Sequence, residues 1–280
     1  MSLITRLSNG WYISMCCFKV LKENRDLVLF PILSGASMIV LTGSFVIAAV
    51  FATNIFSNLF DYDNRGFAYL LAFAFYLINY FIFIFFNVAL MHCVRQYFRG
   101  EEVVLRDGLS FSVSRLGVIL SWSILAATVG TILKIVQEET GIVGKIITGI
   151  LGVIWNIATF FVVPVLAYEN AGPIDAFKRS AQIMKEKWGE SLGGNFSFGL
   201  VQLVGIILIA IPLFLLGSLI NVVVGAALAV FASMLIIAII NAAQAIFISA
   251  VYHRVAGEEV PTVTNEQVDG LFETRRKKLW

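Results

Sequence analysis

The residues best placed to do chemistry lie in the middle of the chain, just after an apolar run. Glu169 ends this run, and Lys178 and Arg179 follow in a short basic segment. A carboxylate and a cationic side chain at this separation form an ion pair when the chain between them turns back. Such a pair would guard a polar entrance or tether the following helix to the bundle. Of these two roles, we expect the ion pair to tether the following helix.

A second set of polar groups consists of carboxamides inside apolar runs. These are Asn79, Asn156, Asn241 and Gln244. Asn241 and Gln244 are three residues apart and therefore share one face of a helix. An amide surrounded by lipid must find a hydrogen-bond partner, so these side chains should point into a helix bundle. We favour a role in joining helices, and the lining of a polar cavity is the alternative.

Motifs for catalysis or metal binding are missing from the sequence. It has no HExxH, no paired Cys/His spacing, no GxSxG and no phosphate-binding GxxxxGK[ST]. We therefore predict no catalytic residue, no metal site and no cofactor. An enzyme acting on lipid is the least favoured alternative, with Glu169, His92 and His253 as its only candidates. The net charge of +2 gives no basis for nucleic-acid binding.

The composition indicates which elements must position these groups. The chain has 280 residues, of which 59% are hydrophobic and 14% charged, whereas a soluble domain carries about 25% charged residues. Charges cluster between apolar runs, and about 20 apolar residues suffice for a helix to cross a bilayer. We predict one membrane domain over residues 1–255, a cytoplasmic tail over 256–280, and six spans at 27–56, 67–93, 116–136, 146–167, 198–220 and 222–251.

The cations predict the orientation of these spans. Seventeen of the 20 Lys and Arg residues fall on one side of the predicted membrane and three on the other. Cytoplasmic segments of membrane proteins are enriched in Lys and Arg, so the first side should be cytoplasmic, together with both termini. No central carboxylate lies in any span, which disfavours an ion-driven carrier.

Each pair of spans is preceded by a cytoplasmic segment with a helical apolar stripe. The spacing predicts amphipathic helices that lie at the membrane surface or pack on the bundle. The fold class is therefore an all-α membrane helix bundle of three hairpins, each preceded by such a helix. We also expect kinks at Pro164 and Pro212. The three stripes are Leu7, Trp11, Phe18 and Leu21; Leu105, Leu109, Val113 and Leu116; and Phe177, Ala181, Met184 and Trp188, with Lys178, Arg179, Lys185 and Lys187 on the polar side of the third.

One stretch is similar to a known pattern. The segments 163–170 (VPVLAYEN) and 173–180 (PIDAFKRS) resemble those of uncharacterised bacterial and archaeal six-span membrane proteins. That group is loosely similar to the membrane domain attached to some glycerophosphodiester phosphodiesterases. The resemblance implies a fold and a prokaryotic membrane, and it implies no activity.

Three functions follow from these expectations. The favoured one is a non-enzymatic membrane scaffold or lipid-interacting protein in the inner (plasma) membrane, with anionic headgroups as partners of the basic helices. A channel or facilitator for a small solute is the second, and a lipid-modifying enzyme the third. A second copy of the chain or another membrane protein would also fit as a partner.

Overall fold

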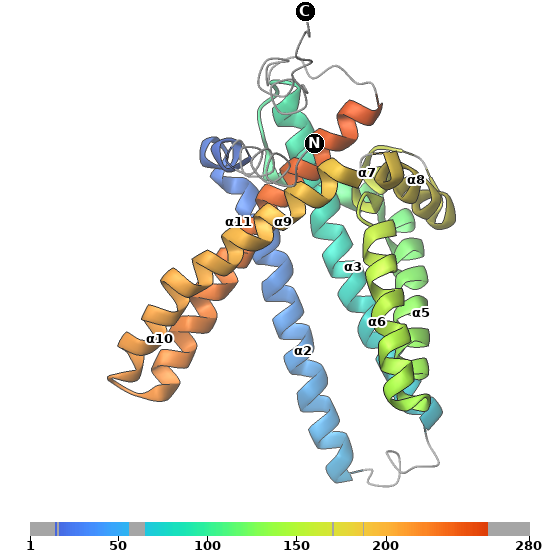
Figure 1. Ribbon diagram of the computed structural model, residues 1–280, viewed down its shortest axis with the longest axis vertical. Helices are drawn as coiled ribbons and strands as arrows, with labels where there is room; N and C mark the ends of the chain where they lie inside the picture. Colours follow the sequence, from blue (N-terminus) through green and yellow to red (C-terminus); the bar gives the residue numbers. More distant parts are fainter. Residues whose placement is uncertain (1–14, 16, 56–64, 170, 187, 257–280) are drawn as a thin grey trace, which may run out of the picture. The chain divides into compact units, whose positions relative to one another are not determined.

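The computed structural model describes residues 15, 17–55, 65–169, 171–186 and 188–256, and every regular element in this part of the chain is helical. The predicted stripe residues Leu7 and Trp11, the side chains of Lys187 and Trp188, and the tail beyond Ala256 lie outside what is described. After a helical turn at residues 17–23, the elements are η1 (Arg25–Val28), α2 (Leu29–Ile55), α3 (Arg65–Phe98), α4 (Leu105–Ser114), α5 (Leu116–Glu139), α6 (Gly141–Ala158), α7 (Val162–Tyr168), α8 (Pro173–Glu186), α9 (Trp188–Gly205), the π-helix η4 (Ile206–Ala210), α10 (Ile211–Ser218) and α11 (Val222–Ala256) (Figure 1).

Six stretches are long and apolar enough to cross a membrane, and each overlaps one predicted span. This confirms the all-α, polytopic architecture. The boundaries differ by up to eight residues: the first stretch ends at Ala48, eight residues before the predicted end at residue 56, and the second continues to Phe98. The six stretches are Arg25–Ala48, Ala68–Phe98, Leu116–Glu139, Gly144–Tyr168, Ser197–Ser218 and Val222–His253.

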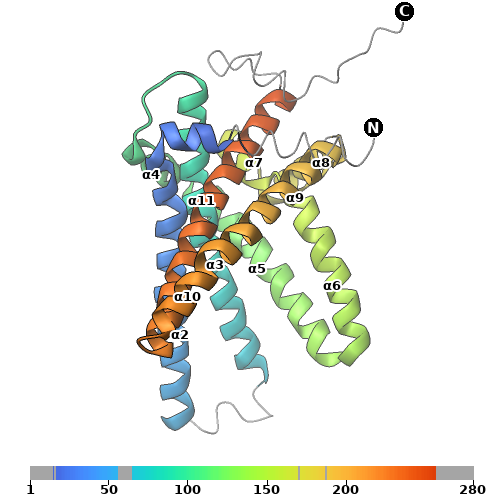
Figure 2. The same ribbon diagram turned by 60° about the vertical axis from the view of Figure 1, so that its left-hand side comes forward.

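The chain divides into two compact units. One comprises residues 33–88 and 109–184, and the other residues 1–32, 89–108 and 185–280. The prediction of one domain over 1–255 stays a prediction. In the first unit, α5 and α6 form an antiparallel hairpin whose arms run side by side in both views (Figures 1 and 2). In the second unit, α9, η4 and α10 form one arm of a hairpin and α11 the other.

Both predicted proline kinks correspond to interruptions of a span. Proline has no N–H and its ring clashes with the carbonyl four residues earlier. The fourth span is accordingly interrupted at residues 159–161, before Pro164, and resumes as α7. The fifth span widens into the π-helix η4 immediately before Pro212. A π-turn is one of the recognised ways in which a helix bends.

The predicted apolar stripe of the second hairpin's leading helix is wrong in part. In α4 the buried positions are Gly108 and Ser112, whereas Val113 and Leu116 are exposed. A side chain at Gly108 would meet Cys93 and the backbone of Ala89, so only glycine fits there. The chain also leaves the helix at Arg115, so Leu116 belongs to the next helix, α5.

Candidate functional site

The fourth span is joined to the helix that follows it by one buried serine. The Ser180 hydroxyl, on α8, donates to the carbonyl of Ala158 at 2.6 Å and accepts from the N–H of Phe161 at 3.0 Å. These two backbone groups flank the interruption between α6 and α7, where the regular helical bonds stop. Unpaired backbone groups are costly when buried. Ser180 is fully buried, so its hydroxyl takes the place of the missing helical bonds.

A second link joins α8 to the end of α7. Arg179 Nε donates to Glu169 Oε1 at 3.0 Å, and each side chain is 32% exposed. Glu169 is the C-terminal cap of α7 and has an extended backbone. A carboxylate at this end of a helix is disfavoured by the helix dipole, and the guanidinium compensates for it. The structure thus pairs Glu169 with Arg179, one of the two cations that the sequence offered, and the geometry is that of the tether.

Aromatic rings form a third link between the α5–α6 hairpin and α8. The rings of Trp122 and Trp155 stack at 6.0 Å with a 9° angle between their planes, and Trp155 stacks on Phe177 at 5.5 Å and 20°. Trp122 comes from α5, Trp155 from α6 and Phe177 from α8. The stack thereby continues from the hairpin onto α8. We call the region around Glu169, Ser180 and this stack the α8 junction.

The face by which α8 packs differs from the predicted one. Its buried residues are Ala176, Ser180, Ile183 and Met184. Phe177 and Ala181 are only half-buried, so the predicted stripe of Phe177, Ala181 and Met184 is displaced around the helix. The predicted stripe did not include Ser180, which is fully buried.

The opposite face of α8 carries the remaining lysines. Ile174, Lys178 and Lys185 are all exposed, and their spacing of four and seven residues places them on one stripe of the helix. Neither lysine forms an ion pair with a carboxylate in the described part of the chain. With Arg179 held by Glu169, these two lysines are the remaining cations of α8, and the exposed carboxylates of Asp175 and Glu186 lie beside their stripe.

The predicted amides are divided between the two units. The Asn79 amide donates to the carbonyl of Phe75, four residues earlier in its own helix, at 2.8 Å. Asn156 is exposed on α6, and both belong to the first unit. Asn241 and Gln244 are half-buried on α11 in the second unit. The hydrogen bond of Asn79 within its own helix shows how an apolar helix accommodates an amide without a partner helix.

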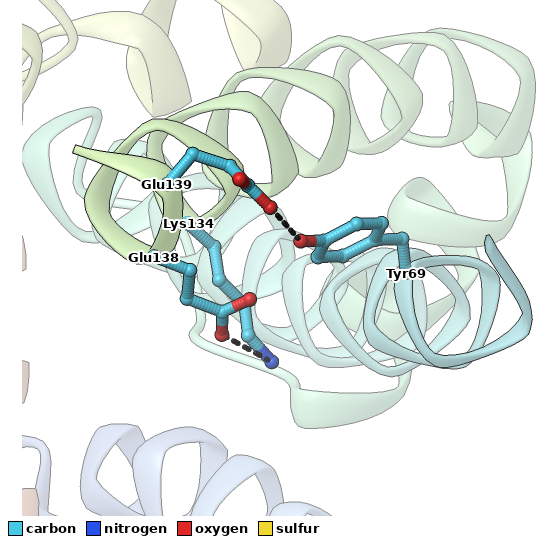
Figure 3. Close-up of polar contacts among 4 residues, drawn as sticks. All are labelled: Tyr69, Lys134, Glu138 and Glu139. Atoms are coloured by element: carbon cyan, nitrogen blue, oxygen red, sulfur yellow. Dashed lines mark hydrogen bonds and ion pairs between the residues drawn. The ribbon is translucent and has the colours of Figure 1, made fainter. Parts of the chain in front are cut away.

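The end of the α5–α6 hairpin away from α8 holds a cavity of about 840 Å³. In its lining, Lys134 lies 3.9 Å from Glu138, and next in the chain Glu139 accepts from the Tyr69 hydroxyl at 3.5 Å (Figure 3). The lining carries charges of both signs. The lining residues are Tyr76, Gly130, Leu133, Lys134, Gln137, Glu138, Gly141, Lys145, Thr148 and Gly149.

Sequence reasoning missed three members of the α8 junction. Ser180, Trp122 and Trp155 have no motif around them, and Ser180 stood inside the quoted KRS segment without a role. The only available signal was Pro164, which predicts a broken span and hence backbone groups in need of a partner.

Within the described residues, no group of three His, Cys, Asp or Glu side chains could hold a metal ion.

Comparison with known proteins places this architecture in a family. A model described as a family of unknown function (DUF6159) matches residues 66–262, which is more than half of the chain. A comparison with curated proteins gives no match. The resemblance to the membrane domain of glycerophosphodiester phosphodiesterases gains no support from these comparisons. The matched region covers α3 to α11 and includes the α8 junction, and the chain belongs to the family of unknown function DUF6159.

Proposed function

We propose that this is a non-enzymatic, lipid-interacting membrane protein in which α8 binds anionic headgroups at the cytoplasmic surface. The observation that carries the proposal is the division of α8 into two faces. One face is fastened to the broken fourth span through Ser180 and is buried. The other presents Ile174, Lys178 and Lys185 together.

The charge distribution supports an anionic partner. Glu169 compensates Arg179, so anchoring α8 uses one cation and leaves Lys178 and Lys185 on the exposed stripe, with the carboxylates of Asp175 and Glu186 off that stripe. An exposed isoleucine beside two lysines on one stripe suits the boundary between acyl chains and headgroups, where long cationic side chains reach the phosphates. A cation near an anionic leaflet contributes about 1 kcal/mol. Two lysines therefore predict about 30-fold preference for an anionic surface.

The fixed position of α8 supports a structural role for this contact. Three links on one short helix, namely the serine bonds, the ion pair and the ring stack, hold it against the fourth span. A helix that is already positioned loses less conformational freedom on binding than a mobile basic segment does. Headgroup binding to α8 would thereby act on the geometry of the interrupted fourth span, to which α8 is linked.

Native mass spectrometry in mild detergent tests the proposal. The wild type and the Lys178→Gln/Lys185→Gln variant are titrated with phosphatidylglycerol and, separately, with phosphatidylcholine. We expect about 30-fold weaker retention of phosphatidylglycerol by the variant and unchanged retention of phosphatidylcholine. Lys134→Gln/Lys145→Gln is the matched control, because it removes the same charge at the far end of the α5–α6 hairpin. Equal phosphatidylglycerol retention by all three proteins would refute the proposal.

A facilitator for a small solute is the second candidate, and the cavity of the α5–α6 hairpin favours it. Gly149 lines this cavity, and a side chain added there would meet no atom within 4 Å. Gly149→Leu should therefore fill the space without distorting the helix. If the cavity is part of a path, glycerol flux into liposomes falls in this variant. Wild-type liposomes with no flux above empty ones would remove this candidate.

A further inference from the structure

The turn between α10 and α11 differs from the other hairpin turns in having no charged residue near it. No Asp, Glu, Lys or Arg occurs anywhere between Glu190 and Arg254. The α5–α6 turn, by contrast, has Glu138 and Glu139 before it and Lys145 after it. Charged side chains are what normally hold a hairpin turn in the aqueous phase. This turn has none.

The side chains at the turn are apolar and point away from the protein. Leu219 is 83% and Ile220 81% exposed, and Val222 and Val223 are also well exposed. Asn221 is the only polar side chain among them. A contiguous exposed apolar patch marks contact with an apolar medium or partner.

Much of the backbone of the turn is satisfied from within the hairpin. Two bonds close it tightly: the N–H groups of Ile220 and Asn221 both donate to the carbonyl of Gly217, at 3.0 and 3.1 Å. The Asn221 side chain is occupied in the same way, because its Oδ1 accepts from the N–H of Val223 at 2.8 Å. Internal satisfaction of backbone groups is the condition for placing a turn in hydrocarbon.

Glycines let the two arms meet without a longer loop. A side chain added at Gly217 would come within 2.7 Å of the Gly225 Cα, and one added at Gly225 within 2.5 Å of the Phe214 carbonyl oxygen. The outgoing arm, Ser197–Ser218, has 22 residues and is therefore about 33 Å long. A hydrocarbon core is about 30 Å thick. With the usual tilt of about 20°, the arm spans about 31 Å along the bilayer normal, so the turn reaches the far boundary of the core.

We propose that the α10–α11 turn, residues 219–223, stays embedded at the far boundary of the hydrocarbon core and contacts lipid acyl chains instead of emerging into water. The hairpin becomes a membrane-embedded wedge, and its partner is the acyl-chain region itself. This inference is independent of headgroup binding by α8.

Spin labelling of the full chain in phosphatidylglycerol/phosphatidylcholine vesicles tests this placement. Cys16, Cys17 and Cys93 are first replaced by alanine, and a nitroxide is attached at Ile220→Cys or, in a second protein, at Val223→Cys. Power saturation then compares the accessibility of the label to oxygen, which concentrates in lipid, with its accessibility to a water-soluble nickel chelate. Ile142→Cys is the matched reference, an isoleucine 79% exposed at the start of α6 beside the charged turn.

We expect an oxygen-to-nickel accessibility ratio above one at both 220 and 223, and higher than at 142. A ratio below one at either turn position would place the turn in water and overturn the inference. Labels at 220 and 223 that neither reagent reaches would also overturn it, because the turn would then be covered by protein. Two label positions guard against a local disturbance by the nitroxide.

Discussion

The hydroxyl of Ser180 lies 3.0 Å from the backbone nitrogen of Phe161 and accepts its hydrogen bond, although the two residues are 19 positions apart. The same hydroxyl donates to Ala158. One small side chain thereby pairs with backbone groups at the interruption of the fourth span and links this span to α8. The lipid-binding surface that we propose depends on this arrangement.

Removal of the Ser180 hydroxyl should destabilise the protein. Ser180→Ala leaves the carbonyl of Ala158 and the N–H of Phe161 without this partner in a buried setting, at an expected cost of about 2 kcal/mol. The measurement is thermal unfolding in detergent. Ser114→Ala is the control, because its exposed hydroxyl bonds only within its own helix, and its effect should stay within about 0.5 kcal/mol. Equal effects of the two substitutions would contradict the bridging role.

The coupling between Glu169 and Arg179 can be measured by a double-mutant cycle. Because both side chains are about one-third exposed, solvent screens the pair, and we expect a coupling of about 1 kcal/mol that shrinks at high salt. The variants are Glu169→Gln, Arg179→Gln and their combination, compared by denaturant unfolding. The parallel cycle of Glu169 with Lys178 should give no coupling. A larger coupling in that cycle would mean that the carboxylate pairs with the wrong cation.

These elements differ in how far the sequence could predict them. The spans were predictable because apolar runs of about 20 residues with few charges are typical of membrane helices. Pairing of Glu169 with a cation of α8 was predictable because chain proximity leaves few partners. Ser180 was not predictable, since its role arises only when a distant helix brings it to the break. The α4 stripe failed for a similar reason: Gly108 is buried because of its small size, which a hydrophobic pattern does not register.

The ring stack predicts a graded response at Phe177. Phe177→Leu keeps apolar volume but loses the stacking on Trp155, and stacked pairs contribute about 1 kcal/mol beyond burial. We expect a loss of that size in thermal unfolding, together with a change in the near-ultraviolet circular dichroism of the tryptophans. Phe83→Leu, at an exposed position on α3, should change neither signal. Identical spectra for all three proteins would show that the stack does not persist in solution.

Glycine-to-alanine substitutions should change protein stability differently in the α10–α11 hairpin and in α2. Gly225→Ala places a methyl group 2.5 Å from the Phe214 carbonyl oxygen, and such overpacking costs about 1–3 kcal/mol. Gly43→Ala on α2 meets no atom within 4 Å, and its higher helix propensity should make it neutral or stabilising by up to about 1 kcal/mol. Thermal unfolding of both variants checks this. If Gly225→Ala is as benign as Gly43→Ala, the close approach of the two arms is wrong.

The central claim is tested most directly by measuring whether α8 contacts anionic lipid. A bimane fluorophore at Ile174→Cys, in the background lacking Cys16, Cys17 and Cys93, is quenched in vesicles by brominated phosphatidylglycerol or brominated phosphatidylcholine. We predict stronger quenching by the anionic lipid at equal content, and loss of that preference when Lys178 and Lys185 are replaced by glutamine. Equal quenching by the two lipids in the protein that retains both lysines would contradict the account.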